Sequence, residues 1–79
     1  MKRTATELGK ILAEMYNNAK RKEMVTMIHL FGIQYHSEIQ EVGIREIIDA
    51  AGIPSTYSTE VNKGVNLAKY AFPRQLPKA

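Results

Sequence analysis

The sequence contains no cysteine, only three prolines and no long apolar run. Without cysteine the chain can form neither a disulfide framework nor a metal site with thiolate ligands. No apolar stretch approaches the roughly 20 residues that a membrane-spanning helix needs. The N-terminal residues are basic but lack the apolar core of a signal peptide, so we expect no membrane segment and no export signal. A cytoplasmic location fits these absences.

Motifs of catalytic sites are also absent. The chain has no glycine-rich phosphate loop, no nucleophile elbow and no H-E-x-x-H pattern. His29 and His36 are separated by Gly32, and two histidines with Glu38 nearby are few ligands for a metal. Partly buried or surface histidines explain them better. We therefore expect no enzyme, no metal, no cofactor and no small-molecule ligand.

Length and composition indicate one small globular domain. The chain has 79 residues, of which 44% are hydrophobic. A domain of this size buries only about 60% of its unfolded surface, so its core is thin and a dimer or a larger partner would add stability. The apolar content argues against general disorder.

The charge is mildly basic and unevenly distributed. The net charge is +3 at pH 7. Counted along the chain, it is +3 over residues 1–37, −3 over residues 38–53 and +3 over residues 54–79. Such alternation suits a protein that presents selected faces to phosphate, although ordinary solvated helix surfaces would give the same pattern.

Two amphipathic helices are expected in the first half. Thr4 and Glu7 have the spacing of a capping box, and apolar residues then recur at helical spacing, which predicts a helix over residues 5–16 that stops at Asn17-Asn18. A second apolar stripe predicts a largely buried helix from Met24 that ends before Gly32. Residues 33–42 alternate partly as a strand would, but no partner strand is visible. We expect a loop and a helical turn over residues 37–40, capped by Ser37.

The second half has the layout of a helix-turn-helix. Apolar residues predict a helix over residues 44–51 that ends at Gly52, and Pro54 prevents its continuation. Ser55 or Thr56 would cap a last helix. Its buried stripe consists of Tyr57, Val61, Val65, Ala68 and Phe72. Gly64 would let another helix, or less plausibly nucleic acid, approach closely.

The polar face of this last helix is the candidate nucleic-acid site. Hydroxyl, amide and ammonium groups can bond base edges or phosphates, and the start of a helix offers free backbone amides. A helix-turn-helix places its second helix in a DNA major groove. The residues expected to contact DNA from this helix are Ser55, Thr56, Thr59, Asn62, Lys63, Asn66 and Tyr70.

Basic residues outside this helix would add phosphate contacts. Lys20, Arg21 and Lys22 form a short basic joint, and Lys2 and Arg3 could contribute if they lie on the same side. Two positions depart from the usual helix-turn-helix pattern: Ile48 stands where a small residue is common, and Ser58 where an aliphatic one is common. Both could change the angle between the helices.

The segments IREIIDAAGI and TEVNKGVNLAKY, within residues 24–72, resemble a group of small bacterial helix-turn-helix-like domain proteins. The resemblance implies this fold and DNA binding, with no defined site to transfer.

The sequence thus predicts an all-α, compact orthogonal bundle of four helices, or five with a short turn. The domain would span residues 1–73, with the helix-turn-helix at residues 44–72 and a tail at residues 74–79. The expected function is binding of double-stranded DNA, with transcriptional regulation as the process considered. A symmetric dimer would match a palindromic site, but the sequence shows no dimer interface. The alternative is a protein–protein interaction module that uses Leu67, Tyr70 and exposed methionines.

Overall fold

Helices make up most of the part of the chain that the structure describes. A computed structural model describes residues 3–70, and within them there is no β-strand. The helices are α1 (Ala5–Asn18), η1 (Arg21–Glu23), α2 (Met24–Gln34), α3 (His36–Val42), α4 (Ile44–Ala51), η2 (Ser55–Tyr57) and α5 (Ser58–Leu67), where η denotes a 3₁₀ turn. The all-α prediction is confirmed in its five-helix form. The expectations for Phe72, Pro73 and the tail at residues 74–79 lie outside the described residues.

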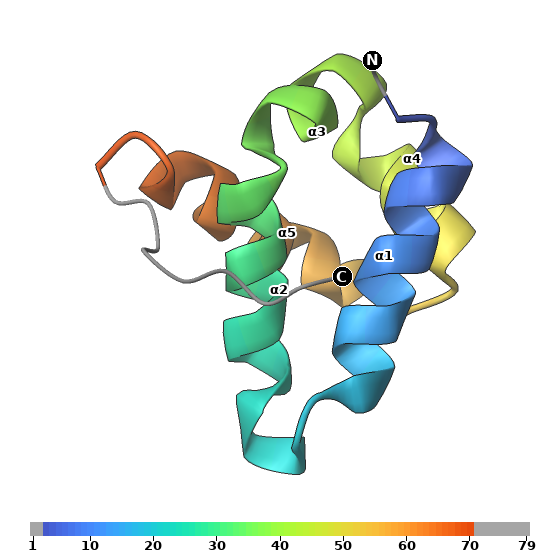
Figure 1. Ribbon diagram of the computed structural model, residues 1–79, viewed down its shortest axis with the longest axis vertical. Helices are drawn as coiled ribbons and strands as arrows, with labels where there is room; N and C mark the ends of the chain where they lie inside the picture. The colour runs from blue at the N-terminus through green and yellow to red at the C-terminus, as the bar shows by residue number, and fades with distance from the viewer. Residues whose placement is uncertain (1–2, 71–79) are drawn as a thin grey trace.

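Two pairs of helices build the bundle. α1 and α2 form a long hairpin, with η1 at its lower tip (Figure 1). α4 packs mainly against α1, whereas α5 crosses α2 and contacts α4 much less. α3 joins the two halves at the upper end of the bundle (Figure 1).

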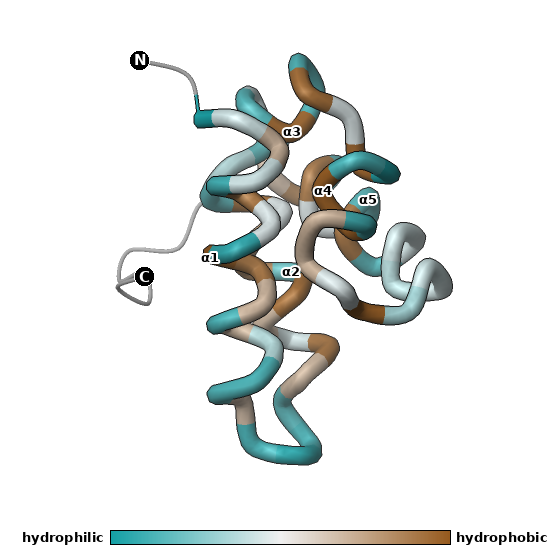
Figure 2. Tube along the Cα trace, turned by 90° about the vertical axis from the view of Figure 1, so that its right-hand side faces the viewer, coloured by the Kyte–Doolittle hydropathy of each residue, from teal (hydrophilic) through white to brown (hydrophobic). Residues whose placement is uncertain are grey.

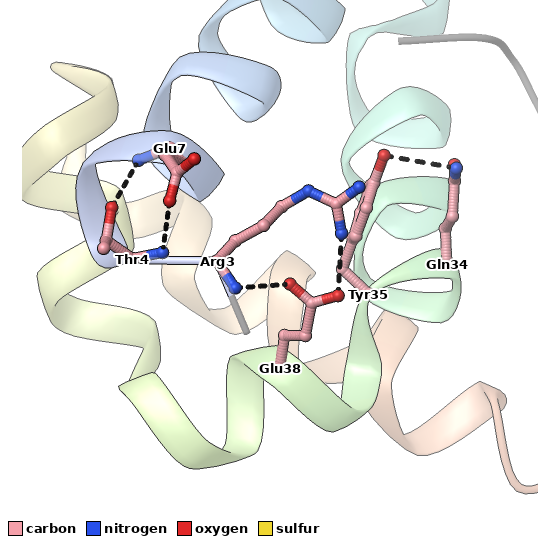
Figure 3. A network of polar contacts seen from close by, with 6 residues as sticks. All are labelled: Arg3, Thr4, Glu7, Gln34, Tyr35 and Glu38. Carbon is pink, nitrogen blue, oxygen red and sulfur yellow. Dashed lines mark hydrogen bonds and ion pairs between the residues drawn. The ribbon is translucent and has the colours of Figure 1, made fainter. Parts of the chain in front are cut away.

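The start of α1 is the capping box that the sequence predicts. The Glu7 N–H donates to the Thr4 hydroxyl at 3.2 Å, and the Thr4 N–H donates to the Glu7 carboxylate at 2.9 Å (Figure 3). The hydrogen bond from the Thr4 N–H is the main cause that lowers the pKa of Glu7, and the hydrogen bond with the Thr4 side chain adds to it. The other end of α1 differs from the prediction, because the helix continues to Asn18 and Ala19 is extended. No residue other than glycine has a positive φ in residues 3–70, so a left-handed asparagine does not end the helix.

Gly32 does not end α2, contrary to the prediction. The helix continues to Gln34, and Gly32 is buried inside it without a positive φ. A Cβ atom on Gly32 would lie 2.5 Å from the Val61 carbonyl oxygen and 2.9 Å from the Gly64 Cα atom. The glycine therefore serves close helix packing rather than a turn.

The prediction for residues 33–42 is also wrong. These residues form the end of α2 and then α3, and Ser37 makes no cap because α3 begins at His36. Burial explains the error: Ile33, Tyr35 and Ile39 are all buried, so tertiary packing supports helix where the local pattern was ambiguous. Gly43 then separates α3 from α4 with a φ of 107°.

The core is a single cluster that draws on every α-helix. Phe31 and Tyr35 lie at its centre with ring centroids 5.3 Å apart. Its largest fully buried side chains are Leu8, Leu12, Ile28, Phe31, Ile39, Ile47, Ile48 and Val61. Apolar (brown) and hydrophilic (teal) stretches alternate along the helices, as expected for amphipathic helices around one core (Figure 2).

Glycine residues allow the helices of both pairs, α2 with α5 and α1 with α4, to pack closely. A Cβ atom on Gly64 of α5 would overlap the His29 carbonyl oxygen of α2, and one on Gly9 of α1 would lie 2.6 Å from the Ala50 Cβ atom of α4. The prediction that Gly64 allows a close helix approach is confirmed, and the neighbour is α2.

We expect Gly64→Ala to destabilise the domain although alanine favours helix. Alanine gains about 1 kcal/mol in helix propensity, but its methyl group meets backbone atoms that cannot move away, and overpacking costs about 1–3 kcal/mol. The net loss should lower the melting temperature measured by circular dichroism. Asn62→Ala is the matched control, because Asn62 is exposed on the same helix. A Gly64→Ala protein as stable as Asn62→Ala would show that α2 and α5 do not touch here.

Candidate nucleic-acid interface

The turn between α4 and α5 is built as the sequence predicts. Gly52 has left-handed angles, with φ 72° and ψ 23°, and its N–H donates to the carbonyl oxygens of Ile48 at 3.1 Å and Asp49 at 3.2 Å. These bonds satisfy the last carbonyl groups of α4. Pro54 then turns the chain away, and α5 follows after the short η2 turn. The helix-turn-helix geometry thus rests on one left-handed glycine.

The start of the second helix differs from the prediction. Ser55 and Thr56 lie in η2, neither caps a helix, and α5 begins only at Ser58. Tyr57 anchors η2 to α1, because its ring meets that of Tyr16 edge-on at 5.3 Å. The side-chain interaction with Tyr57 raises the pKa of Tyr16. An aromatic contact to α1, rather than a side-chain cap, therefore positions the beginning of this segment.

α5 turns one face inward and the other outward. Val61, Gly64 and Val65 are buried against α2. The polar residues that the sequence places on the opposite face are all exposed: Ser55, Thr56, Thr59, Asn62, Lys63 and Asn66. We call these six residues the α5 surface. Tyr70, the seventh predicted residue, has an exposed fraction of 86% but lies in the turn after α5.

The acidic residue Glu60 borders the α5 surface, and it is paired. Glu60 Oε1 lies 2.7 Å from His29 Nε2, and Glu60 Oε2 lies 3.5 Å from Lys63 Nζ. The hydrogen bond with His29 is the main cause that lowers the pKa of Glu60, and Lys63 adds to it. The carboxylate is therefore ionised at neutral pH, while the Lys63 side chain remains 59% exposed.

Arg45 is a candidate that the sequence analysis missed. A shallow hollow between α4 and α5 is lined by Arg45, Ile48, Asp49, Ser55 and Ser58. Arg45 is exposed and forms no ion pair within residues 3–70. It is the only basic residue in the acidic segment 38–53, where no local pattern singles it out. Only folding shows that it lines the same hollow as Ser55.

The two unusual positions of the helix-turn-helix have separate roles. Ile48 is 2% exposed and belongs to the core. Ser58 is the first residue of α5 and lines the same hollow as Arg45. The larger residue thus fills the core, and the polar one stands at the border with solvent.

The basic turn at Lys20, Arg21 and Lys22 is exposed but lies apart from α5. It forms the lower tip of the α1–α2 hairpin, whereas α5 crosses α2 higher up (Figure 1). The structure therefore brings Arg45 to the α5 surface and leaves these three bases at the end of the hairpin.

Arg3 does not join either basic group. Its guanidinium pairs with Glu38 at 2.8 Å and lies over the Tyr35 ring, 5.2 Å from the centroid (Figure 3). Arg3 thus lies just before the start of α1, whereas the basic turn follows the other end of that helix. The condition that Arg3 lies on the same side as the basic turn is therefore not met, its contact with phosphate stays a prediction, and Lys2 lies outside the described residues.

Neither histidine belongs to a metal cluster in the described part of the chain. His29 contacts Glu60, and His36 Nδ1 contacts the Ile33 carbonyl oxygen at 2.9 Å. Within residues 3–70 no three side chains of the metal-binding types come together. The same residues include no helix long and apolar enough to cross a bilayer.

Two helices joined by a short turn that contains glycine have the layout of a helix-turn-helix, as α4, Gly52 and α5 do here. The chain belongs to the family of HTH-like domains, whose family model matches residues 4–73. No curated protein and no solved structure shows significant similarity to the chain.

The Glu60 contacts give domain stability a dependence on pH. Because folding lowers the pKa of Glu60 below its usual value of 4.5, its pairing stabilises the fold above that value and is lost as the pH falls through the lower folded value. We expect the wild type to lose more stability than Glu60→Gln between pH 5 and pH 3, roughly the range below the usual carboxyl pKa. Urea unfolding of both proteins at the two pH values measures this. An equal loss in both would show that the pairing contributes nothing.

Proposed function

We propose that this chain is a DNA-binding domain that contacts the duplex through the α5 surface. One observation carries the proposal: six side chains with hydroxyl, amide or ammonium groups are exposed along η2 and α5. The opposite face of α5, with Val61, Gly64 and Val65, is buried against the core. Family membership supports the same function, since a helix-turn-helix offers its second helix to the major groove.

The chemistry of the α5 surface suits both bases and phosphates. Asn62 and Asn66 carry the amides that bond adenine edges, and Lys63 can reach guanine or phosphate. Thr59 and the residues of η2 supply hydroxyl groups for phosphate oxygens. In this proposal α5 reads the groove and η2 holds the backbone beside it.

Arg45 and the basic turn would extend the contact to the flanking backbone. Arg45 stands next to Ser55 at the hollow. Lys22 of η1 comes seven residues before His29 of α2, which corresponds to about 10 Å of helix rise. The basic turn could therefore reach a phosphate a few nucleotides from the groove contact, at a rise of about 3.4 Å per nucleotide of one strand.

The wider setting is part of the same proposal. A binding domain without catalytic chemistry, active in the cytoplasm and acting on transcription, is the role that fits best. A two-fold dimer would let two copies of α5 meet a palindromic site.

A protein-interaction module is the second candidate, and a separate observation favours it. Leu67 is the last residue of α5 and Tyr70 lies three residues later in the turn that follows, with exposed fractions of 44% and 86%. Exposed apolar residues at one place can mark a protein contact. Salt separates the two functions, because DNA binding weakens steeply as salt rises, whereas docking through apolar side chains changes little.

An NMR titration of the domain with a mixed-sequence duplex at low salt tests the proposal directly. We expect amide shifts to concentrate in residues 55–66, which include η2 and most of α5. No shift at low salt would end the DNA hypothesis, and shifts confined to the region of Leu67 and Tyr70 on adding a protein partner would favour the second candidate.

Lys63→Ala should weaken duplex binding. If Lys63 bonds a base, the loss should be about 1–3 kcal/mol and should relax sequence preference at that position. If it bonds a phosphate, binding should weaken for all sequences and the salt slope should fall by about one. Fluorescence anisotropy over a salt series measures both. Lys10→Ala is the matched control, since Lys10 is exposed on α1, outside the α5 surface; equal effects of the two changes would remove Lys63 from the site.

Arg45→Gln should weaken binding to every duplex by a similar factor. A phosphate contact carries no sequence information, so the salt slope should fall by about one while sequence preference stays the same. Asp49→Asn should act in the opposite direction, because it removes a negative charge from the same hollow. The same anisotropy series applies. An unchanged salt slope in Arg45→Gln would exclude Arg45 from the interface.

A further inference from the structure

A single carboxylate connects the buried side of α5 with its exposed side. Glu60 binds His29 of α2 through one oxygen and approaches Lys63 of the α5 surface through the other, at 2.7 Å and 3.5 Å. The side chains of His29 and Glu60 are only 28% and 24% exposed. Their contact lies where α2 and α5 cross, next to the backbone contact of His29 with Gly64.

The net charge of these three groups depends on one proton. With a neutral imidazole, Glu60 cancels Lys63 and the sum is zero. With a protonated imidazole the sum is +1. A neutral imidazole with its proton on Nε2 and an imidazolium can both donate to Glu60, so the contact survives in both states and only the charge changes.

Other charged groups on the helices around α2 do not pair with His29. In the described residues, the charged side chains of α1 and η1 are all exposed and none forms an ion pair with the imidazole; they are Glu7, Lys10, Glu14, Arg21, Lys22 and Glu23. On α3, Glu38 pairs with Arg3, Glu41 is exposed, and His36 contacts a carbonyl oxygen of α2. Glu60 and Lys63 of α5 therefore set the surroundings of His29.

We infer that His29 is a positioning residue of the DNA-facing surface: it holds Glu60 beside Lys63, and its protonation adds a positive charge there that strengthens attachment to duplex DNA. This inference rests on the proposed function and adds a regulation to it. Binding becomes tighter as the pH falls, and each complex formed near neutral pH takes up a fraction of one proton.

General electrostatics gives the direction and the scale. The negative potential of a duplex favours the charged form of an imidazole that lies close to it. Unit charges about 4 Å apart in water interact by about 1 kcal/mol, which corresponds to roughly a fivefold change in affinity. A change of charge at one side chain is therefore enough to give a measurable change in affinity.

The test is duplex affinity at constant salt from pH 8 to pH 5.5, for wild type, His29→Gln and His36→Gln. Wild type should bind about threefold to tenfold more tightly at the lower pH. His29→Gln should lose most of this change. His36→Gln is the matched control and should keep it, because His36 contacts a backbone carbonyl away from α5.

A purely structural role for His29 gives a different result. Loss of packing would weaken binding by the same factor at every pH and leave the pH profile of the remaining affinity as steep as in wild type. That outcome, or a wild-type affinity independent of pH, would overturn the inference while leaving DNA binding intact. No duplex binding by wild type at any pH would overturn the proposed function itself.

Calorimetry keeps the test independent of how well the variants fold. Titration of duplex into wild type at pH 6.5, in two buffers with different ionisation enthalpies, reports the protons taken up on binding. We expect an uptake in wild type and in His36→Gln. Equal heats in the two buffers for wild type would contradict the inference.

Discussion

The contact between Gly32 of α2 and Gly64 of α5 is the constraint on which the rest of the structure depends. With no side chain at either position, the two backbones approach so closely that a Cβ atom on either glycine would overlap the other helix. Val61 and Val65 then reach the core on either side of this contact. Gly9 and Ala50 make a similar approach between α1 and α4. A 79-residue chain has little apolar surface to bury, so close packing at these two crossings matters for its stability.

The same crossing also determines what α5 offers to solvent. Because Val61, Gly64 and Val65 face α2, the residues between them must face outward, and these are the polar side chains of the α5 surface. The crossing also brings His29 to Glu60, so a residue of the central helix contacts an acid that borders that surface. The helix contact and the electrostatics of the candidate interface therefore have one origin.

Local signals in the sequence were sufficient wherever a single interaction decides the structure. Thr4 and Glu7, three residues apart, form a capping box. Gly52 ends α4 because the backbone there has left-handed angles, which glycine adopts readily. Both features were predicted correctly. The prediction for Gly32 was wrong because glycine occurs both in turns and where helices pack closely. The prediction for Ser55 was wrong because serine occurs both at helix caps and in 3₁₀ turns. Gly32 is inside a helix because it packs against Gly64. Ser55 lies in η2, which the contact between Tyr16 and Tyr57 holds in place.

The sequence by itself determined that the chain is helical, where α4 stops, and which side of α5 is polar, because periodicity and capping involve residues within one turn of each other. Only the tertiary structure decided that α3 is a helix, that Arg45 stands beside Ser55, that Arg3 is held by Glu38 and that His29 meets Glu60. The last two pairs are 35 and 31 residues apart in the chain. Contacts at such separations arise from how the helices cross, and no local pattern encodes them.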